Sequence, residues 1–140
     1  VSESAILRQA ENIARINPEG ILATLFSQAS DNPPIECVFD AARQGDIQVQ
    51  KMIEERGYYL GIALTNLVNL FNPELILLGG IFSRGDDLFI KPVMQTIQQR
   101  AFGGLGKNVR VQAASFGWKS GVTGAAALAL LHFFYQQIEI

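Results

Sequence analysis

The middle of the chain carries its clearest hydrophobic pattern. From residue 60 onward, apolar side chains recur at helical spacing, and a second side of the same segment is apolar as well. The first side consists of Leu60, Ala63, Leu64, Leu67, Val68 and Phe71, and the second of Tyr59, Ile62 and Leu70. This pattern predicts a core helix that protein covers on more than one face.

A strand and a glycine corner are predicted directly after this helix. Asn72-Pro73 should end the helix, because proline cannot donate a helical hydrogen bond and disfavours the α region for the residue before it. The run from Leu75 to Leu78 is continuously apolar, which is typical of a strand in a parallel sheet covered on both faces. Gly79 and Gly80 then close the strand.

Two further helices are predicted at the start of the chain. Ser2 is a suitable N-cap for a first helix that runs to about Arg15. Asn17-Pro18 predicts the start of the second, because an N-cap residue is followed by proline at the first helical position.

The helical pattern continues up to the central helix. Pro34 predicts the start of a third helix, which should end at Gly45, and Asp46 is then expected to cap the long fourth helix. Gly57 and Gly61 form a G-x-x-x-G pair within that fourth helix. We interpret the pair as a place where another helix approaches closely.

The chain after the corner predicts one more helix and a second strand. Ser83 to Asp87 is expected to be a solvated loop and 88–90 a short turn, with Pro92 starting a helix. Residues 102–108 contain three glycines and predict a mobile loop. Val109 to Ser115 alternates in hydrophobicity, which predicts a strand with one less buried face. A final helix should follow Ser120.

Strand, helix and strand in this order indicate a parallel β-α-β unit. The predicted fold class is therefore α/β, mostly helical, with a two-stranded parallel sheet. Two parallel strands make a small sheet, so we expect its companions to come from outside these 140 residues. Because the chain starts at Val1 without methionine, we expect it to be one domain's worth of a longer protein.

Composition excludes several classes of function. The net charge is −2, and there is no Lys/Arg cluster of the kind that binds nucleic acid. No apolar run reaches the roughly 18 residues of a membrane span, and no signal segment is visible, so we expect a cytoplasmic protein without a membrane partner. One cysteine, Cys37, and one histidine, His132, cannot supply the roughly four ligands of a structural zinc site.

The best candidate for chemistry is the corner at Gly79 and Gly80, with Ser83 beside it. It follows a parallel strand, and open α/β sheets bind ligands at the carboxyl ends of their strands. The alternative is a glycine turn that only lets the chain reverse. Gly124 is the second candidate, because a helix start with small side chains can meet the polar edge of a ligand. Close helix-to-sheet packing is the alternative there.

The corner is not a phosphate-binding P-loop. Gly80 and Gly85 have the G-x-x-x-x-G spacing, but Asp86 and Asp87 follow where a P-loop needs Lys and Ser or Thr. Two carboxylates at this place would repel a phosphate group. No other segment carries a general acid, a general base or a cluster of metal ligands in a recognisable pattern.

The sequence from Leu60 to Glu74, followed by Ile76-Leu77-Leu78-Gly79-Gly80, resembles the C-terminal half of ROK proteins. Gly121 to Leu130, with Gly124-Ala125-Ala126-Ala127, is similar to the last helix of that family. These proteins are bacterial sugar kinases and sugar-responsive transcriptional repressors built on the actin-like ATPase, or ribonuclease H-like, fold. The resemblance therefore implies the C-terminal part of such a domain, within a region that binds sugar and forms oligomers.

The resemblance also implies what this chain lacks. In the kinases of the family the matching glycines border the adenosine of ATP, and many carry a third glycine where this chain has Ile81. The catalytic Asp, the phosphate loop, the sugar-binding residues and the zinc site of the family belong to upstream segments. We therefore expect no cofactor in this chain, although the parent family holds zinc and its kinases bind ATP.

Three functions remain open from the sequence. The first is the effector-sensing and oligomerising part of a sugar-responsive repressor, which would form a homo-oligomer and contact DNA only through an N-terminal domain. The second is the matching half of a sugar kinase, inactive without its other half. The third is an interaction module that acts through association. The run Asn66 to Pro73 and the missing third glycine resemble the repressor branch more closely.

Overall fold

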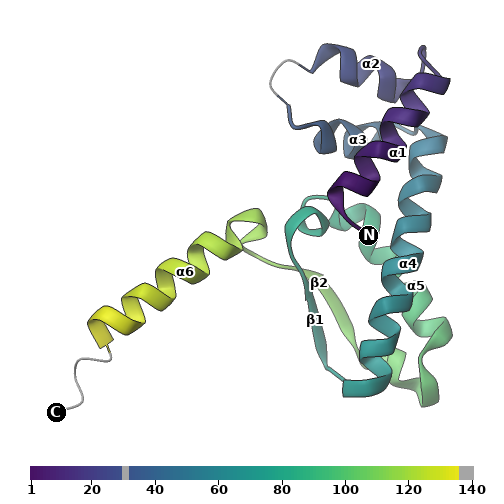
Figure 1. The fold of residues 1–140 in the computed structure, drawn as a ribbon. Coiled ribbons are helices and arrows are strands. Elements are labelled where there is room, and N and C mark those ends of the chain that lie inside the picture. The colour runs from purple at the N-terminus through teal and green to yellow at the C-terminus, as the bar shows by residue number, and fades with distance from the viewer. Residues whose placement is uncertain (30–31, 136–140) are drawn as a thin grey trace.

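The computed structural model describes residues 1–29 and 32–135, without the side chains of Trp118, Ser120 and Tyr135. Helices stack along one long central helix, a pair of strands lies beside its second half, and the last helix runs away from the body (Figure 1). The helices and strands are α1 (Glu3–Ile16), α2 (Ile21–Gln28), α3 (Pro34–Arg43), α4 (Ile47–Phe71), β1 (Leu75–Leu78), α5 (Asp86–Arg100), β2 (Arg110–Ala113) and α6 (Ser120–Leu130).

The body has two hydrophobic cores, one at each end of α4. The first core lies between α1, α2, α3, the start of α4 and Phe89 of α5, and its largest fully buried side chains include Phe39 and Phe89. The second lies between the end of α4, α5 and the strands, and includes Val68, Val93 and Ile97. Because α4 and α5 contribute to both cores, these two helices join the halves of the body.

The strands form the predicted parallel pair. β1 pairs with β2 in a register that places Leu75 opposite Arg110 and Leu78 opposite Ala113. Among the described residues this is the whole sheet, so the mostly helical fold with a two-stranded parallel unit is confirmed. The second strand is shorter than predicted, four residues instead of the run from Val109 to Ser115.

The expectation that β1 is covered on both faces is wrong for this chain. Leu78 is buried, whereas Leu77 is 59% exposed and Leu75 is 41% exposed. The reason is that α4 and α5 pack on one face of the strand pair and leave the side chains of the other face uncovered. The central helix is likewise uncovered on the side of Leu70 and Phe71, which are 74% and 68% exposed, although it was expected to be covered on more than one face.

The predicted close helix contact at Gly57 and Gly61 is confirmed. A Cβ atom placed on Gly57 would lie 2.6 Å from Cγ of Pro92, and one on Gly61 would lie 2.5 Å from Cβ of Thr96. Both partners are on α5, and both glycines are buried. A side chain at either glycine would therefore push the two helices apart.

The helix N-caps are partly as predicted. Ser2 Oγ accepts a hydrogen bond from the Ala5 amide at 3.3 Å, and Asp46 Oδ1 accepts from the Gln48 amide at 3.1 Å. Asp46 also accepts from the Leu22 amide at 3.3 Å through its other oxygen, so one carboxylate serves the starts of α2 and α4.

The predicted start of the second helix at Asn17-Pro18 is wrong. Asn17 is the C-cap of α1, because its amide donates to the carbonyl of Ile13. Asn17 and Pro18 lie in the connection between the two helices, and α2 begins only after its N-cap Gly20.

The predicted helix start at Pro92 is also wrong. α5 begins at Asp86, so the expected turn at 88–90 is helical and Pro92 lies inside the helix. Asp86 and Asp87 occupy the first turn, where carboxylates interact favourably with the helix dipole. Pro92 removes one helical hydrogen bond, but its ring fills the space that Gly57 leaves open.

Residues 102–107, expected to be a loop, form tight 3₁₀ turns in which Gly103 and Gly104 have positive φ angles of 56° and 83°.

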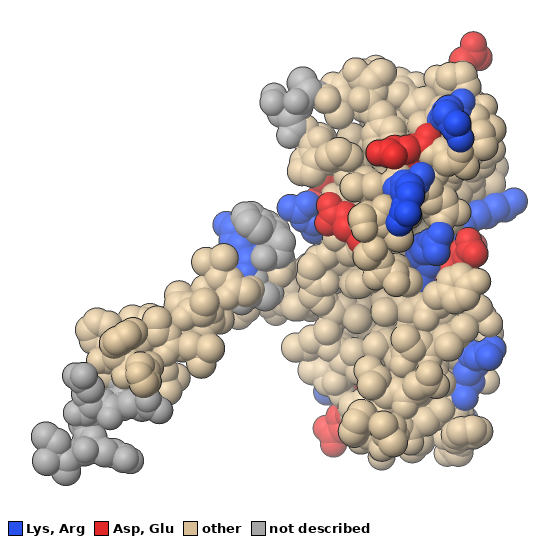
Figure 2. Space-filling model, viewed as in Figure 1, with Lys and Arg blue, Asp and Glu red and all other residues tan. Residues whose placement is uncertain are grey.

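The final helix is where the sequence predicted it, but it lies alone. Each residue from Gly121 to Leu130 is exposed. This helix and the following turn to Phe134 carry no Lys, Arg, Asp or Glu (Figure 2). We call residues 121–134 the apolar arm. No helix among the described residues combines the length and apolar character needed to cross a bilayer.

Candidate functional site

Three of the four predicted site residues meet at the end of β1. Gly79 continues the strand in an extended conformation, and Gly80, with a φ angle of +63°, starts a 3₁₀ turn from Gly80 to Ser83. Ser83 Oγ donates a hydrogen bond to the Gly80 carbonyl at 2.7 Å, which closes the turn. Gly79, Gly80 and Ser83 therefore form one corner at the carboxyl end of the strand.

The corner has open space beside it. Apart from the residues directly adjoining in the chain, no atom lies within 4 Å of the position that a Cβ would take on Gly79 or on Gly80. The positive φ angle of Gly80 favours glycine at this position. Gly79 has a φ angle of −103°, which any residue can adopt, so packing within this chain does not explain glycine there.

The connection from β2 to the last helix borders the corner. The Ala114 amide donates to the Leu78 carbonyl at 2.9 Å, which extends the strand pairing by one bond. The following turn brings Gly117 beside the corner, where an added Cβ would lie 3.5 Å from Ser83 Oγ.

Gly124 is not brought to this corner. It lies on α6, it is exposed, and no atom is within 4 Å of its Cβ position. The close helix-to-sheet packing that we considered as its alternative role is likewise not formed in this chain.

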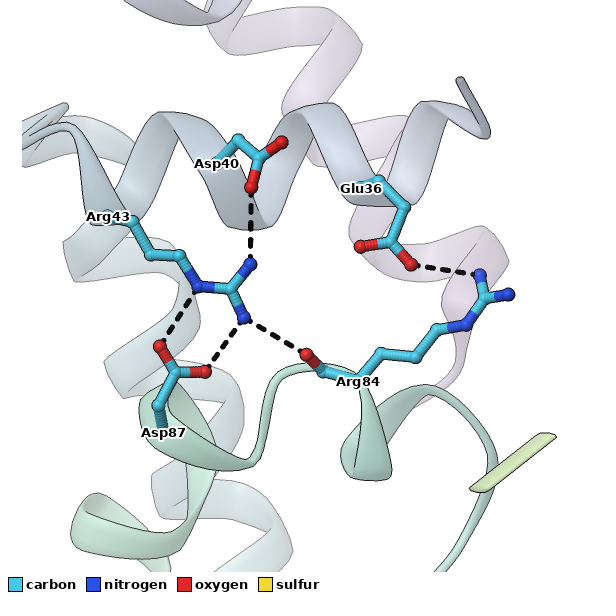
Figure 3. Close-up of polar contacts among 5 residues, drawn as sticks. All are labelled: Glu36, Asp40, Arg43, Arg84 and Asp87. Atoms are coloured by element: carbon cyan, nitrogen blue, oxygen red, sulfur yellow. Dashed lines mark hydrogen bonds and ion pairs between the residues drawn. The ribbon is translucent and has the colours of Figure 1, made fainter. Parts of the chain in front are cut away.

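A polar network fixes the chain that leaves the corner (Figure 3). Arg43 of α3 holds Asp87 with two hydrogen bonds, Nε to Oδ2 at 3.0 Å and Nη2 to Oδ1 at 2.9 Å. Its Nη2 also donates to the Arg84 carbonyl at 3.0 Å, and its Nη1 pairs with Asp40 at 3.2 Å. Arg84 in turn pairs with Glu36 at 3.1 Å.

The network changes the electrostatics of its members. The hydrogen bonds from Arg43 lower the pKa of the Asp87 carboxyl below its usual value, and they raise the pKa of Arg43. Arg84 and Asp87 are therefore parts of a structured junction between α3 and α5, and the prediction of a solvated loop there is wrong.

Sequence reasoning missed this network. One signal was present, because Glu36, Asp40 and Arg43 share one face of α3 at helical spacing. Their partners follow the glycine corner, more than 40 residues further along the chain. No local pattern reports a contact over that separation.

The other ionisable candidates lie apart from the corner. Cys37 is buried, and burial raises the pKa of its thiol. His132 is on the apolar arm, where its ring meets the edge of Phe133. Within the described ranges, no three His, Cys, Asp or Glu side chains gather where they could hold a metal ion. The corner itself thus offers backbone groups and a hydroxyl to a ligand.

Two solved structures share this architecture. A ROK family glucokinase from Streptomyces griseus, solved with glucose and AMPPNP, superposes with a TM-score of 0.74 at 29% identity and covers 91% of this chain. A ROK family transcriptional regulator, a homolog of Escherichia coli Mlc, superposes with a TM-score of 0.76 at 28% identity over 91% of this chain.

The chain belongs to the ROK family, whose family model matches residues 1–131. A glucokinase from Halalkalibacterium halodurans is 33% identical over 125 residues, which is 85% of this chain. The chain spans only 38% of that glucokinase, 42% of the S. griseus enzyme and 31% of the regulator. The resemblance seen in the sequence is therefore confirmed for the family.

The Arg43–Asp87 pair should make stability depend on pH. Because the pKa of Asp87 is lower in the folded chain than the roughly 3.9 of an unfolded Asp, its carboxylate stabilises the fold above that value, and the contribution is lost as pH falls through the folded-state pKa. We expect Asp87→Asn to cost about 0.2–1 kcal/mol at pH 7, since the pair is partly exposed.

Urea unfolding of both proteins between pH 7 and about pH 2 measures this difference. The gap between wild type and Asp87→Asn should close in acid. Asp86→Asn is the matched control, because Arg43 binds the neighbouring carboxylate. A gap that does not change with pH would show that the pair contributes no charge-dependent stability.

Proposed function

We propose that this chain is the C-terminal effector-sensing and oligomerising part of a ROK-type transcriptional regulator that responds to a sugar. The observation that carries the proposal is the glycine corner. It is open to a ligand at Gly79 and Gly80, yet two charged residues that follow it in the chain, Arg84 and Asp87, are engaged in the network with α3. Such a corner can sense a ligand through backbone contacts but has no group of its own for acid–base catalysis.

Ile81 further supports the interpretation of the chain as part of a regulator. Many kinases of the family carry a third glycine at this position, beside the adenosine of ATP. In this chain the Ile81 side chain packs against the first core and is only partly buried. A branched side chain at the corner reduces the space that a nucleotide would need. This favours a ligand other than a nucleotide.

The second candidate is the C-terminal half of a ROK-type sugar kinase. The observation that favours it is the 33% identity to a glucokinase over most of this chain. In that case Gly79 and Gly80 would border ATP, and the catalytic Asp, the phosphate loop and the zinc site would be supplied by the rest of the parent protein. The chain alone would then be inactive.

At the level of the fold, we propose that the chain completes an actin-like ATPase domain in a cytoplasmic parent protein. The uncovered face of β1, with Leu75 and Leu77, and the apolar arm are surfaces that a larger domain would bury. Further strands beside β1 or β2 would extend the sheet. DNA contact would come only from a separate N-terminal domain.

We also propose that the parent protein is a homo-oligomer. Contiguous exposed apolar surface of the kind found on the end of α4 and on the apolar arm is typical of protein–protein contacts. Light scattering coupled to size-exclusion chromatography should give a molecular mass of at least twice that of one chain. We expect this both for the complete protein and for this chain of 15.3 kDa. A monomer at tens of micromolar would contradict this.

The experiment that separates the two functions uses the protein encoded by the complete reading frame. For a regulator we expect specific binding to its promoter DNA, released by one sugar, and no ATP-dependent phosphorylation of hexoses or xylose. Sugar phosphorylation without DNA binding would instead assign the chain to a kinase.

In the same protein, Gly80→Val tests the corner. We expect it to abolish the response to the sugar. Gly45→Val is the matched control, because Gly45 also has a positive φ angle, +94°, and open space around it, and so carries the same backbone strain away from the corner. An unchanged response in a folded Gly80→Val protein would leave the corner with a structural role alone.

A further inference from the structure

A concave surface separate from the glycine corner lies between α1 and α4. This groove has a volume of about 720 Å³, within the range of small-molecule sites. Its lining is polar and rich in arginine, and consists of Ala5, Arg8, Gln9, Glu11, Asn12, Arg15 and Arg56. None of these residues belongs to the glycine corner or to the network around Arg43.

Arg56 is the residue that α4 contributes to the groove, and its hydrogen bonding is incomplete. Its Nη2 donates to the Oε1 atom of Gln9. Its Nε is buried and has no hydrogen-bond partner among the described residues. A buried N–H group without a partner costs free energy, and such groups are rare in folded proteins.

Arg43 shows what the Nε and Nη2 atoms of an arginine bind when both have a hydrogen-bond partner. In Arg43, Nε and Nη2 together hold the two oxygens of the Asp87 carboxylate, at 3.0 and 2.9 Å. In Arg56, one amide oxygen occupies Nη2 and leaves Nε empty. An anion with two oxygens in one plane would satisfy both donors of Arg56, and phosphate and carboxylate groups have this geometry.

The charge of the groove also favours an anion. Arg8, Arg15 and Arg56 all line it, and none of them makes an ion pair with a described carboxylate. Glu11 is the one acidic residue of the lining. A local excess of positive charge in a chain of net charge −2 is a feature that a bound anion would explain.

We propose that this groove binds the phosphate group of a small molecule through Arg56, with Arg8 and Arg15 as further donors. The Gln9 side chain occupies part of the place of the anion and must turn away from Nη2 when the anion binds. Its amide can then donate to the ligand. Gln9 and Asn12 supply the amide groups that suit the hydroxyls of a phosphate ester, and free phosphate would use the arginines alone.

Isothermal titration calorimetry of the 140-residue chain tests this site. The probes are inorganic phosphate, glucose 6-phosphate and glucose. We expect saturable binding of a phosphate-containing probe that weakens as salt is raised, and no binding of glucose in this groove. Tighter binding of glucose 6-phosphate would assign the site to a phosphate ester, whereas equal affinity would assign it to free phosphate.

Substitutions identify the donors. Arg56→Gln and Arg56→Lys should each weaken phosphate binding at least about tenfold, because lysine keeps the charge but cannot offer two donors in one plane. Gln9→Ala should keep or strengthen the binding of inorganic phosphate, because free phosphate uses the arginines alone and the amide oxygen no longer occupies Nη2 of Arg56. Arg100→Gln is the matched control, because Arg100 is exposed on α5 beside Tyr58 and does not line the groove.

Two results would overturn the proposal. One is the absence of saturable phosphate binding at millimolar concentration, and the other is equal binding by wild type and the Arg56 variants. If an Arg56 variant fails to fold, as judged by circular dichroism, the exposed pair Arg8→Gln with Arg15→Gln replaces it, with the same expected loss of affinity.

Discussion

The close approach of α4 and α5 is the constraint on which the rest of the body depends. Gly57 and Gly61 present bare backbone to α5, and Pro92 and Thr96 fill the space where side chains would otherwise stand. Each helix contributes to both hydrophobic cores, through Val49 and Val68 on α4, and through Phe89 and Val93 on α5. A wider spacing of the two helices would therefore loosen both cores together.

The glycine corner takes its position from the same pair of helices. β1 packs on the end of α4, and the turn after it leads directly into α5, where Arg43 of α3 holds Asp87. Phe82 in this turn meets the ring of Phe89 edge to face at 5.2 Å, which ties the corner to the first core. The corner is thus held by contacts with α3 and α5, while the space beside Gly79 and Gly80 is open.

Hydrophobic periodicity and capping residues were enough to predict most of the fold. They gave the central helix, the cap at Asp46, β1 and the parallel strand pair, because each depends on neighbouring residues. The helix start predicted at Pro92 is wrong because a proline at a helix start and a proline inside a helix have the same local sequence signal. The difference is made by Gly57, which is distant in sequence and leaves room for the ring.

The candidate sites were less predictable, because many of their contacts also join residues that are distant in sequence. Gly79, Gly80 and Ser83 are neighbours in sequence and could be recognised together, whereas the Arg43–Asp87 and Arg56–Gln9 pairs each join residues more than 40 positions apart. Leu77 was expected to be covered because an apolar strand usually is. Its side chain is exposed because α4 and α5 pack on the other face of the strand pair, and no local pattern reports which face a neighbouring helix covers.

The most direct test of the central constraint is the unfolding free energy of Gly61→Ala and Gly57→Ala. In an open helix, alanine in place of glycine stabilises by about 1 kcal/mol. Here the added methyl group would overlap Thr96 or Pro92, so we predict a loss of about 1–3 kcal/mol in urea unfolding. Asn66→Ala, at an exposed position of the same helix, is the control and should be neutral or slightly stabilising. Stabilisation by Gly61→Ala and Gly57→Ala would show that α4 and α5 are not held at this close spacing, and would contradict the account.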